Sequence, residues 1–206
     1  MIQLSDIQDA QQALSGQIVH TPFTHSRTLS DMLGSQIWLK FENLQFTASF
    51  KERGAYNRMR TLTPEQRQRG VITMSAGNHA QGVAYHAQRM KIPAVIVMPK
   101  FTPTVKVANT KRLGAEVVLH GETFDDARAR ALELADSRGL TLIHPYDDDA
   151  VIAGQGTIGL EMLADNPELD LLLVPIGGGG LIAGIATAVK ALRPEIKIIG
   201  VQTEAF

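Results

Sequence analysis

The chain has 206 residues, of which 44% are hydrophobic and 20% are charged, a composition typical of a globular protein with one large or two small domains. The formal net charge is -1, so the charge balance favours neither a nucleic acid nor an anionic membrane as a partner. There is no cysteine, which excludes a disulfide framework and a thiolate zinc site.

No segment looks like a targeting or membrane-spanning element. Residues 1–10 carry acids and lack an apolar core, so they do not resemble a signal peptide. No uninterrupted apolar run reaches the length of a transmembrane helix. Together with the missing cysteines, these features predict a cytoplasmic protein without a membrane partner.

The first chemically suggestive segment is residues 47–54, Thr-Ala-Ser-Phe-Lys-Glu-Arg-Gly. Lys51 follows the aromatic Phe50 among small residues. A lysine held in an apolar pocket has a lowered pKa and can form a Schiff base with a carbonyl compound. Most lysines are solvated helix residues, and on this segment alone that alternative stays open.

From residue 71 onward, short apolar runs alternate with longer amphipathic stretches. This alternation predicts an α/β fold with a parallel sheet and right-handed crossovers. Apolar runs without internal alternation predict strands that are covered on both faces. The predicted strands are Val71–Met74, Ala94–Met98, Glu116–Leu119 and Thr141–Ile143, and the predicted helices are Asn78–Arg89, Thr104–Leu113 and Thr123–Arg138.

A polar loop that begins at Ser75 follows the first of these strands and opens a helix. One interpretation is that Ser75 and Asn78 cap that helix. The other is that a carboxylate binds at the helix N-terminus. His79, taken singly, is more typical of a satisfied polar residue than of a ligand. Gln155, in Gln-Gly-Thr at residues 155–157, opens another helix and is equally ambiguous alone.

Residues 144–149 contain Pro145 and an acidic run, which predict a linker that ends in a helix N-cap. Beyond it the pattern predicts a second sheet, which would lack a covering layer because the chain stops just after a strand, at Phe206. We therefore expect the 206 residues to be part of a longer protein. The elements concerned are strands near Ile37–Phe41, Leu171–Pro175 and Lys197–Val201, and helices over Ala150–Leu163 and Leu181–Leu192.

These elements predict two domains. A small α/β domain would cover residues 71–147. A large, discontinuous domain would combine residues 1–70 with 148–206, and its C-terminal part would be absent.

The strongest local signal is the four glycines from Gly177 to Gly180, between a strand and a helix. Without side chains the backbone can approach an anion closely, and the N–H groups and the helix dipole favour a phosphate. A structural turn needs only one or two glycines, and four cost backbone entropy with no return in packing. A dinucleotide site is the rival phosphate interpretation, because Gly178, Gly180 and Ala183 fit G-x-G-x-x-A and Glu204 lies near the next strand end.

Metal chemistry has no support in the sequence. The six histidines show no metal-ligand spacing, and neither H-E-x-x-H nor an EF-hand loop occurs. The acids of residues 161–165 and 147–149 are interpreted as solvated faces or helix caps.

Taken together, the motifs resemble the fold-type II pyridoxal-phosphate enzymes, the tryptophan-synthase-β-like superfamily, and within it the threonine dehydratase (threonine ammonia-lyase) and serine racemase branch. The resemblance runs from about His20 to the C-terminus. The order and separation of the motifs match that branch. The motifs are Ser49-Phe50-Lys51 with Arg53-Gly54-Ala55, Ser75-Ala76-Gly77-Asn78-His79, Ala153-Gly154-Gln155-Gly156-Thr157 and Gly177–Leu181.

The resemblance implies pyridoxal 5′-phosphate (PLP) as cofactor and a role for each matching residue. Lys51 would hold the cofactor as a Schiff base and, once freed, remove the Cα proton of an amino acid. Phe50 would pack near the ring, and Asn78 would hydrogen-bond the ring hydroxyl. The phosphate would be held by Gly177, Gly178, Gly179, Gly180 and Leu181. The substrate carboxylate would be surrounded by Ser75, Asn78, His79 and Gln155.

The implied reaction is the deamination of L-threonine, and of L-serine, to a 2-oxo acid and ammonia. The resemblance also implies a homo-oligomer in the full-length parent and a role in amino-acid metabolism such as isoleucine biosynthesis.

The sequence departs from the family pattern in two ways that matter. Serine racemases carry a serine at Ala76, so alanine favours dehydration over racemisation. The family's partner of the pyridine nitrogen would lie beyond Phe206. Gln202 is uncharged where some relatives use an acid to bind a metal, so no metal is predicted.

Three alternatives stay open. The motifs do not read the substrate side chain, so another β-elimination lyase, acting on hydroxyaspartate or diaminopropionate, fits them equally. The shortness of the chain also allows a catalytically incomplete fragment or binding module. A dinucleotide-dependent oxidoreductase is the third.

Overall fold

The computed structural model describes residues 1–204, and Ala205 and Phe206 lie outside the described part. The helices are α1 (Leu4–Leu14), α2 (Arg27–Leu33), the 3-10 helix η1 (Glu42–Leu44), α3 (Lys51–Arg60), α4 (Pro64–Arg69), α5 (Asn78–Met90), α6 (Thr104–Arg112), α7 (Phe124–Arg138), α8 (Asp149–Asp165) and α9 (Gly180–Leu192). The strands are β1 (Phe23–His25), β2 (Trp38–Lys40), β3 (Val71–Met74), β4 (Ala94–Met98), β5 (Glu116–Leu119), β6 (Thr141–Leu142), β7 (Leu171–Pro175) and β8 (Lys197–Val201).

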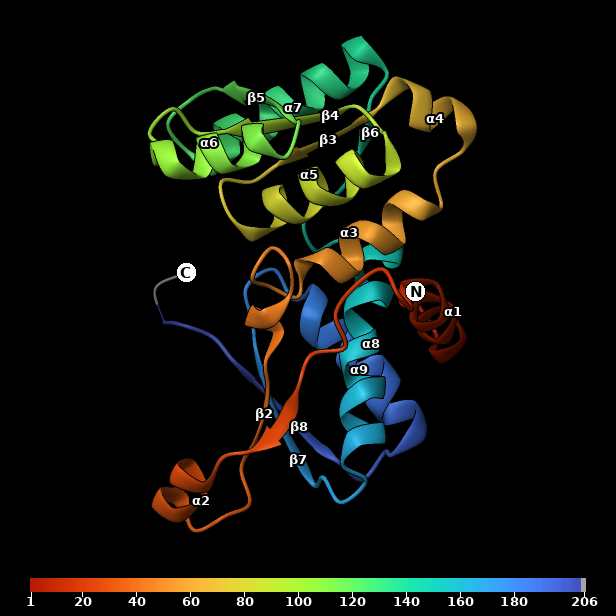
Figure 1. The fold of residues 1–206 in the computed structure, drawn as a ribbon, viewed down its shortest axis with the longest axis vertical. Helices are drawn as coiled ribbons and strands as arrows, with labels where there is room; N and C mark the ends of the chain where they lie inside the picture. The colour runs from red at the N-terminus through yellow and green to blue at the C-terminus, as the bar shows by residue number, and fades with distance from the viewer. Residues whose placement is uncertain (205–206) are drawn as a thin grey trace.

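The upper part of the molecule is built on a four-stranded sheet with the order β5-β4-β3-β6, and every pairing in it is parallel (Figure 1). All residues of β3 and β4 are buried, because alternate side chains enter two cores. Val71 and Ile96 pack with α3 and α5 on one face, whereas Ile72 and Val97 pack with α7 on the other. The predicted parallel α/β architecture is confirmed here.

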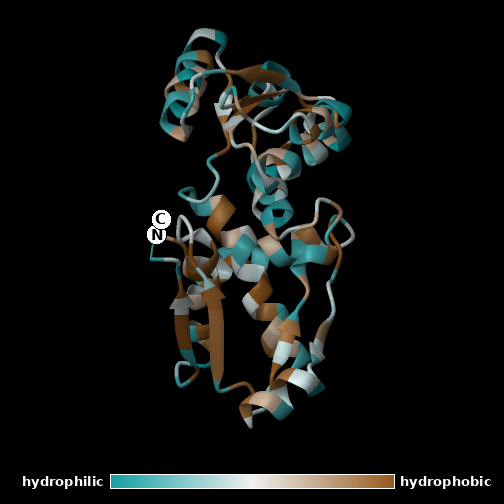
Figure 2. Ribbon diagram, turned by 90° about the vertical axis from the view of Figure 1, so that its left-hand side faces the viewer, coloured by the Kyte–Doolittle hydropathy of each residue, from teal (hydrophilic) through white to brown (hydrophobic). Residues whose placement is uncertain are grey.

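The lower part contains α8 and α9, which pack on each other, and the parallel pair β7-β8 (Figure 1). One face of this pair is covered: Leu172 and Val174 pack with the core residues of α8 and α9. The opposite face is not, since Leu173 is 64% exposed and Val201 is 54% exposed. Figure 2 shows these apolar strands side by side in the lower half of the molecule. The prediction that the second sheet would lack a covering layer is therefore confirmed for β7 and β8.

The strand predicted near Ile37–Phe41 exists as β2 but belongs to a different sheet. It pairs antiparallel with β1, with Thr24 opposite Leu39, and not with β7 or β8. A three-residue strand such as β1 gives too short a pattern for its pairing to be anticipated.

Helices before residue 71 escaped prediction, and for different reasons. In α1, Ile7, Ala10 and Leu14 are buried at helical spacing, a signal that the sequence does contain. In α3 the buried positions include Glu52 and Arg53, so the apolar periodicity that identifies a helix is missing. The predicted cap before α8 is confirmed: the Asp148 side chain accepts a hydrogen bond from the Val151 amide at 3.0 Å.

Across residues 1–204, every helix is too short or too polar to span a lipid bilayer.

Candidate functional site

Residues from four separate stretches of the chain meet in one cavity of about 140 Å³. It lies at the carboxyl end of β7, where ligand sites of parallel α/β sheets are commonly found. Its walls come from the start of α3, the linker before α8, α8 itself and the loop between β7 and α9. The lining residues are Phe50, Lys51, Pro145, Tyr146, Gln155, Pro175, Gly177, Gly178, Gly179, Gly180 and Leu181.

Lys51 is the first residue of α3 and projects into this cavity. Its Nζ donates a hydrogen bond to the Pro145 carbonyl oxygen at 2.6 Å and lies 5.3 Å from the centre of the Phe50 ring. Burial disfavours the charged ammonium and lowers the pKa of Lys51 to about 8. A fraction of the amine is therefore neutral near physiological pH, which is what a nucleophile or base requires.

The glycine loop offers backbone donors at the start of a 13-residue helix. Gly179 has φ 86°, a left-handed conformation that disfavours other residues, and α9 begins directly after it. Within residues 1–204, the amide groups of Gly177, Gly178 and Gly179 make no hydrogen bond. Free N–H groups at a helix N-terminus suit the phosphate of PLP.

Tyr146 packs directly on the glycine loop, a contact that sequence reasoning missed. A Cβ at Gly178 would collide with the Tyr146 ring, and one at Gly180 would lie 2.6 Å from the Tyr146 carbonyl oxygen. The expectation that four glycines bring no return in packing is therefore wrong for these two positions. The linker residue gave no signal, because an aromatic residue beside a proline is unremarkable in a sequence.

Gln155 reaches the cavity from α8 and is 1% exposed. Its Oε1 accepts a hydrogen bond from the Gly54 amide at 3.2 Å, whereas its Nε2 has no partner among residues 1–204. The helices α3 and α8 can approach this closely because a Cβ on Gly154 would lie 2.7 Å from Gly54 Cα. A buried amide donor without a partner, at the wall of a cavity, suits an acceptor on a bound molecule.

The loop after β3 lies outside the cavity. Ser75 Oγ accepts a hydrogen bond from the Gly77 amide at 3.1 Å, and Gly77 is the N-cap of α5. The interpretation in which the Ser75 and Asn78 side chains cap this helix is therefore wrong. Asn78 is exposed, and His79 is buried with its Nε2 3.0 Å from the Ile143 carbonyl oxygen. Burial lowers the pKa of His79 to about 3, so the ring is neutral and donates this bond.

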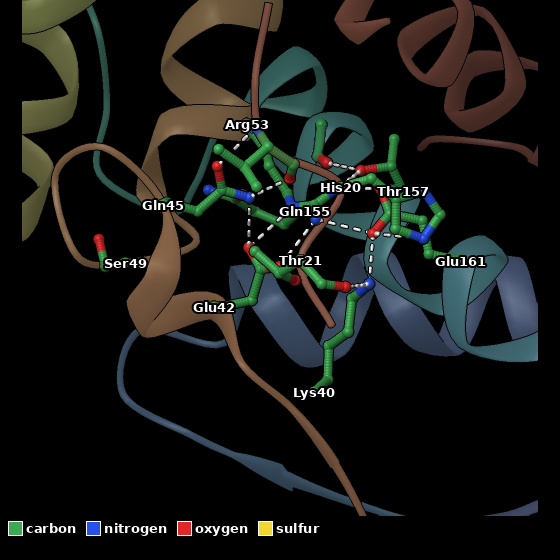
Figure 3. Close-up of polar contacts among 12 residues, drawn as sticks. His20, Thr21, Lys40, Glu42, Gln45, Ser49, Arg53, Gln155, Thr157 and Glu161 are labelled. Atoms are coloured by element: carbon green, nitrogen blue, oxygen red, sulfur yellow. Dashed lines mark hydrogen bonds and ion pairs between the residues drawn. The ribbon is translucent and has the colours of Figure 1, made fainter. Parts of the chain in front are cut away.

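A buried ionic network anchors α3, the helix that begins at Lys51 (Figure 3). The guanidinium of Arg53 lies 2.7 Å from Glu42 and 2.6 Å from Glu161, and Lys40 Nζ lies 2.6 Å from Glu161. Burial alone would raise the pKa of Glu161, but the hydrogen bonds and positive charges of Arg53 and Lys40 lower it overall. Glu161 is thus buried and paired, which corrects its interpretation as part of a solvated face. Sequence patterns cannot reveal such a pairing, since its partners are far apart in the chain.

Comparisons with known proteins agree with one another. A family model described as a pyridoxal-phosphate dependent enzyme matches residues 14–206. The L-threonine ammonia-lyase of Thermotoga maritima is 52% identical over 204 residues, 99% of this chain and 51% of that protein. The solved structure of threonine deaminase isoform 2 from Solanum lycopersicum has 47% identity and a TM-score of 0.91, covering 97% of this chain and 54% of that one. Maize serine racemase has 38% identity and a TM-score of 0.93, covering 96% and 60%.

The chain spans about half the length of the Thermotoga maritima protein, and 54% and 60% of the two solved chains.

Proposed function

The chain belongs to the family of pyridoxal-phosphate-dependent enzymes, and from this premise we propose that it binds PLP through Lys51 and deaminates L-threonine, and also L-serine, by β-elimination. The products are 2-oxobutanoate or pyruvate, with ammonia. The observation that supports this proposal is the shared cavity, in which a lysine of lowered pKa faces the free amides of the glycine loop. The names of the similar proteins support the choice of substrate.

Lys51 has two tasks in this proposal. Its neutral amine attaches the cofactor, and when the substrate has taken its place the freed amine accepts the proton from the substrate Cα. When bound, PLP supplies the electron sink that makes this proton removable. The Pro145 carbonyl oxygen holds Nζ at the cavity wall. Because the side chain is already ordered, Lys51 loses less conformational entropy when it binds the cofactor.

The remaining residues bind and orient. We assign the phosphate to the amides of the glycine loop, Gly177 to Gly180, and of Leu181, where the α9 dipole adds to the attraction. Phe50 would pack against the ring, and Asn78 would hydrogen-bond the ring hydroxyl.

The substrate carboxylate is assigned to the Gln155 amide together with the loop of Ser75, Asn78 and His79. The neutral His79 ring already donates its one N–H to the Ile143 carbonyl oxygen, so His79 would offer the carboxylate its backbone amide near the start of α5, and neither a charge nor a ring proton. Only Gln155 of these four borders the cavity, so the other three assignments rest on the resemblance of the motif.

Spectroscopy of the purified protein supplied with PLP tests the proposal. We expect a visible imine band that borohydride removes, and peptide mapping should place the reduced adduct on Lys51. Threonine should then yield 2-oxobutanoate and ammonia, measured on the 206-residue chain and on the intact protein that carries it. Folded protein without an imine band would refute the Lys51 assignment. Product from hydroxyaspartate or diaminopropionate, but not from threonine, would refute the substrate assignment alone.

We also propose a cytoplasmic location, a homo-oligomer in the intact protein, and a role in amino-acid metabolism that includes isoleucine biosynthesis. The absence of cysteine supports a reducing compartment. Cell fractionation, light scattering and growth of a deletion strain without isoleucine would test the three points separately.

A further inference from the structure

The residue next to Lys51 in α3, Glu52, forms a pair with His86 of α5. Both are buried titratable groups that the proposed reaction does not use. Glu52 of α3 and His86 of α5 are both 0% exposed, and Glu52 Oε2 lies 3.8 Å from His86 Nε2. Among residues 1–204, neither this carboxylate oxygen nor either ring nitrogen of His86 has a hydrogen-bond partner. Buried polar groups are nearly always hydrogen-bonded, so this arrangement needs an explanation.

The second oxygen of Glu52 closes the loop that leads to Lys51. Glu52 Oε1 accepts a hydrogen bond from the Thr47 amide, which ties the two ends of the loop together. Inside this loop Ala48 has φ 57°, a left-handed conformation that a residue with a side chain rarely adopts and that its surroundings must hold in place. Glu52 is thus one of the groups that hold the backbone on the N-terminal side of Lys51.

Helix α5 supports Lys51 from the other side. A Cβ at Gly82 would lie only 3.3 Å from the Glu52 amide nitrogen and from the carbonyl carbon of Lys51, so the backbones of α3 and α5 are in close contact. Tyr56 and Tyr85 pack edge-on against His86, with ring centres 5.2 and 4.9 Å away. These rings keep water from the pair and fix the orientation of the imidazole.

Burial favours the neutral form of both groups. Burial raises the pKa of Glu52, the negative Glu42 of η1 adds to this rise, and the Thr47 hydrogen bonds and Arg89 of α5 oppose it. Burial lowers the pKa of His86 to about 3, and Arg89 adds to that effect. Arg53, the other neighbouring cation, is already paired with Glu42 and Glu161. An acid that is hard to ionise therefore faces a base that is hard to protonate.

We propose that Glu52 and His86 share one proton as a neutral buried couple, and that this couple positions Lys51 for the reaction proposed above, on which the inference rests. The proton lies on Glu52 Oε2, directed at His86 Nε2, and a side-chain adjustment of roughly 1 Å gives an ordinary hydrogen bond. Glu52 then holds the Thr47 amide with one oxygen and α5 with the other. His86 and Glu52 act through Lys51 and touch neither substrate nor cofactor.

Two substitutions at Glu52 separate this couple from a charged pair. Glu52→Gln keeps the shape of a protonated acid, because its amide oxygen can accept from Thr47 and its NH₂ can donate to His86. It should retain PLP affinity and the pH midpoint of the imine absorption band within about twofold. Glu52→Leu leaves the Thr47 amide without a partner and should weaken PLP binding roughly tenfold and move the midpoint. Glu168→Leu, a change at an exposed acid, is the matched control and should alter neither.

Infrared spectroscopy observes the proton directly and needs no cofactor. The difference between wild-type protein and Glu52→Gln at pH 7 should contain the carbonyl stretch of a protonated carboxylic acid. A carboxylate band in its place, or a Gln variant as impaired as the Leu variant, would overturn the inference, and so would a Leu variant that matches the wild type. If Glu52→Leu does not fold, His86→Leu provides the same comparison from the other partner.

The failure of the proposed function would look different. Wild-type protein without a borohydride-sensitive imine band would refute the assignment of Lys51, whereas the infrared result would still decide whether Glu52 and His86 share a proton.

Discussion

Two strand–loop–helix units of this chain begin alike and present different chemistry. In one, β3 leads through residues 75–77 into α5, and in the other, β7 leads through residues 176–179 into α9; both helices contain 13 residues. The loop after β3 offers the hydroxyl of Ser75 and the amide of Asn78, whereas the loop after β7 offers backbone N–H groups. Only the second loop borders the cavity with Lys51.

One supersecondary unit can thus bind a ligand through its backbone or through its side chains. A glycine loop suits a fixed group such as a phosphate, because an added side chain can keep the anion away from the backbone N–H groups. A loop with polar side chains can be changed one residue at a time, and the helix behind it remains. If this division holds, changes at residues 176–179 alter cofactor affinity, changes at residues 75–77 alter the product, and changes at Lys51 alter both.

The largest effect is expected at Lys51, because it is proposed to act on both the cofactor and the substrate. Lys51→Ala should reduce ammonia release from threonine by a factor on the order of 10³ or more, because one side chain attaches the cofactor and accepts the Cα proton. The fold should persist, since removing a partly charged buried amine costs little packing. The ammonia assay measures the loss of activity, and circular dichroism measures whether the fold persists. Lys106→Ala, at an exposed lysine, is the control, and near wild-type turnover in Lys51→Ala would contradict the central assignment.

The next effect concerns the glycine loop. Gly178→Leu should weaken PLP binding roughly tenfold to a hundredfold, which corresponds to the loss of one or two hydrogen bonds to a charged group. Titration with PLP measures the affinity, and thermal unfolding should change less. Equal affinity with a lower melting temperature would show that the glycine serves only the turn.

Tyr146 makes this second test sharper, because a side chain at Gly178 collides with its ring. If the collision is the only cause, Tyr146→Ala should restore the affinity lost in Gly178→Leu. If close approach of the phosphate is the cause, as proposed, most of the loss should persist in the double variant. The coupling between the two substitutions therefore measures how much of the glycine requirement comes from packing.

A third effect, of about tenfold, should appear in the pH dependence of Lys51. With a pKa of about 8, its reaction with PLP should accelerate about tenfold from pH 7 to a plateau above pH 9, whereas an exposed lysine continues to accelerate. Borohydride trapping followed by mass spectrometry measures both rates. The free energy of unfolding without PLP should also rise between about pH 8 and pH 10.5, since there only the unfolded state keeps the proton on Lys51. A midpoint near 10 would refute the effect of burial.

The stretches before and after residue 71 also differed in how well the sequence predicted their elements. The strands β3 and β4 were predicted with their observed bounds, because continuous apolar runs between helical patterns have few other interpretations. The helix α3 was missed, because its buried face carries Glu52 and Arg53 in place of apolar residues. The strand β1 and its pairing with β2 were missed, because three-residue strands show no periodicity.

The candidate site divides in the same way. Lys51, Gln155 and the glycine loop were expected from local motifs, and the structure brings them into one cavity. Tyr146 and the pairing of Arg53 with Glu161 were not, because both depend on contacts between distant segments. Motifs therefore revealed groups whose chemistry is local, and the fold revealed those that acquire a role only through their neighbours.

The smallest effect is expected in the loop after β3, where a single methyl group separates two reactions. Ala76 lies between Ser75 and Gly77 and is partly buried against the core of the upper part. Its methyl side chain has no acidic proton to donate. Racemisation of serine needs a proton donor on the face of Cα opposite to the lysine, and the resemblance to the racemase branch assigns that place to the residue at position 76.

Ala76→Ser should therefore raise the ratio of D-serine to pyruvate formed from L-serine, by roughly threefold to tenfold, because the new hydroxyl can act as that donor without the tuned surroundings of a racemase. PLP affinity should not change, since the phosphate loop after β7 is untouched. Chiral chromatography of the serine pool beside a 2-oxo acid assay measures the ratio, and Gly77→Ala, in open space on the same loop, controls for disturbance of the backbone. Abundant D-serine from the unchanged protein would overturn the assignment as a dehydratase and leave the role of Lys51 standing. A ratio that stays constant in Ala76→Ser would show that this loop does not face Cα, and the division of labour between the two loops would fail on its substrate side.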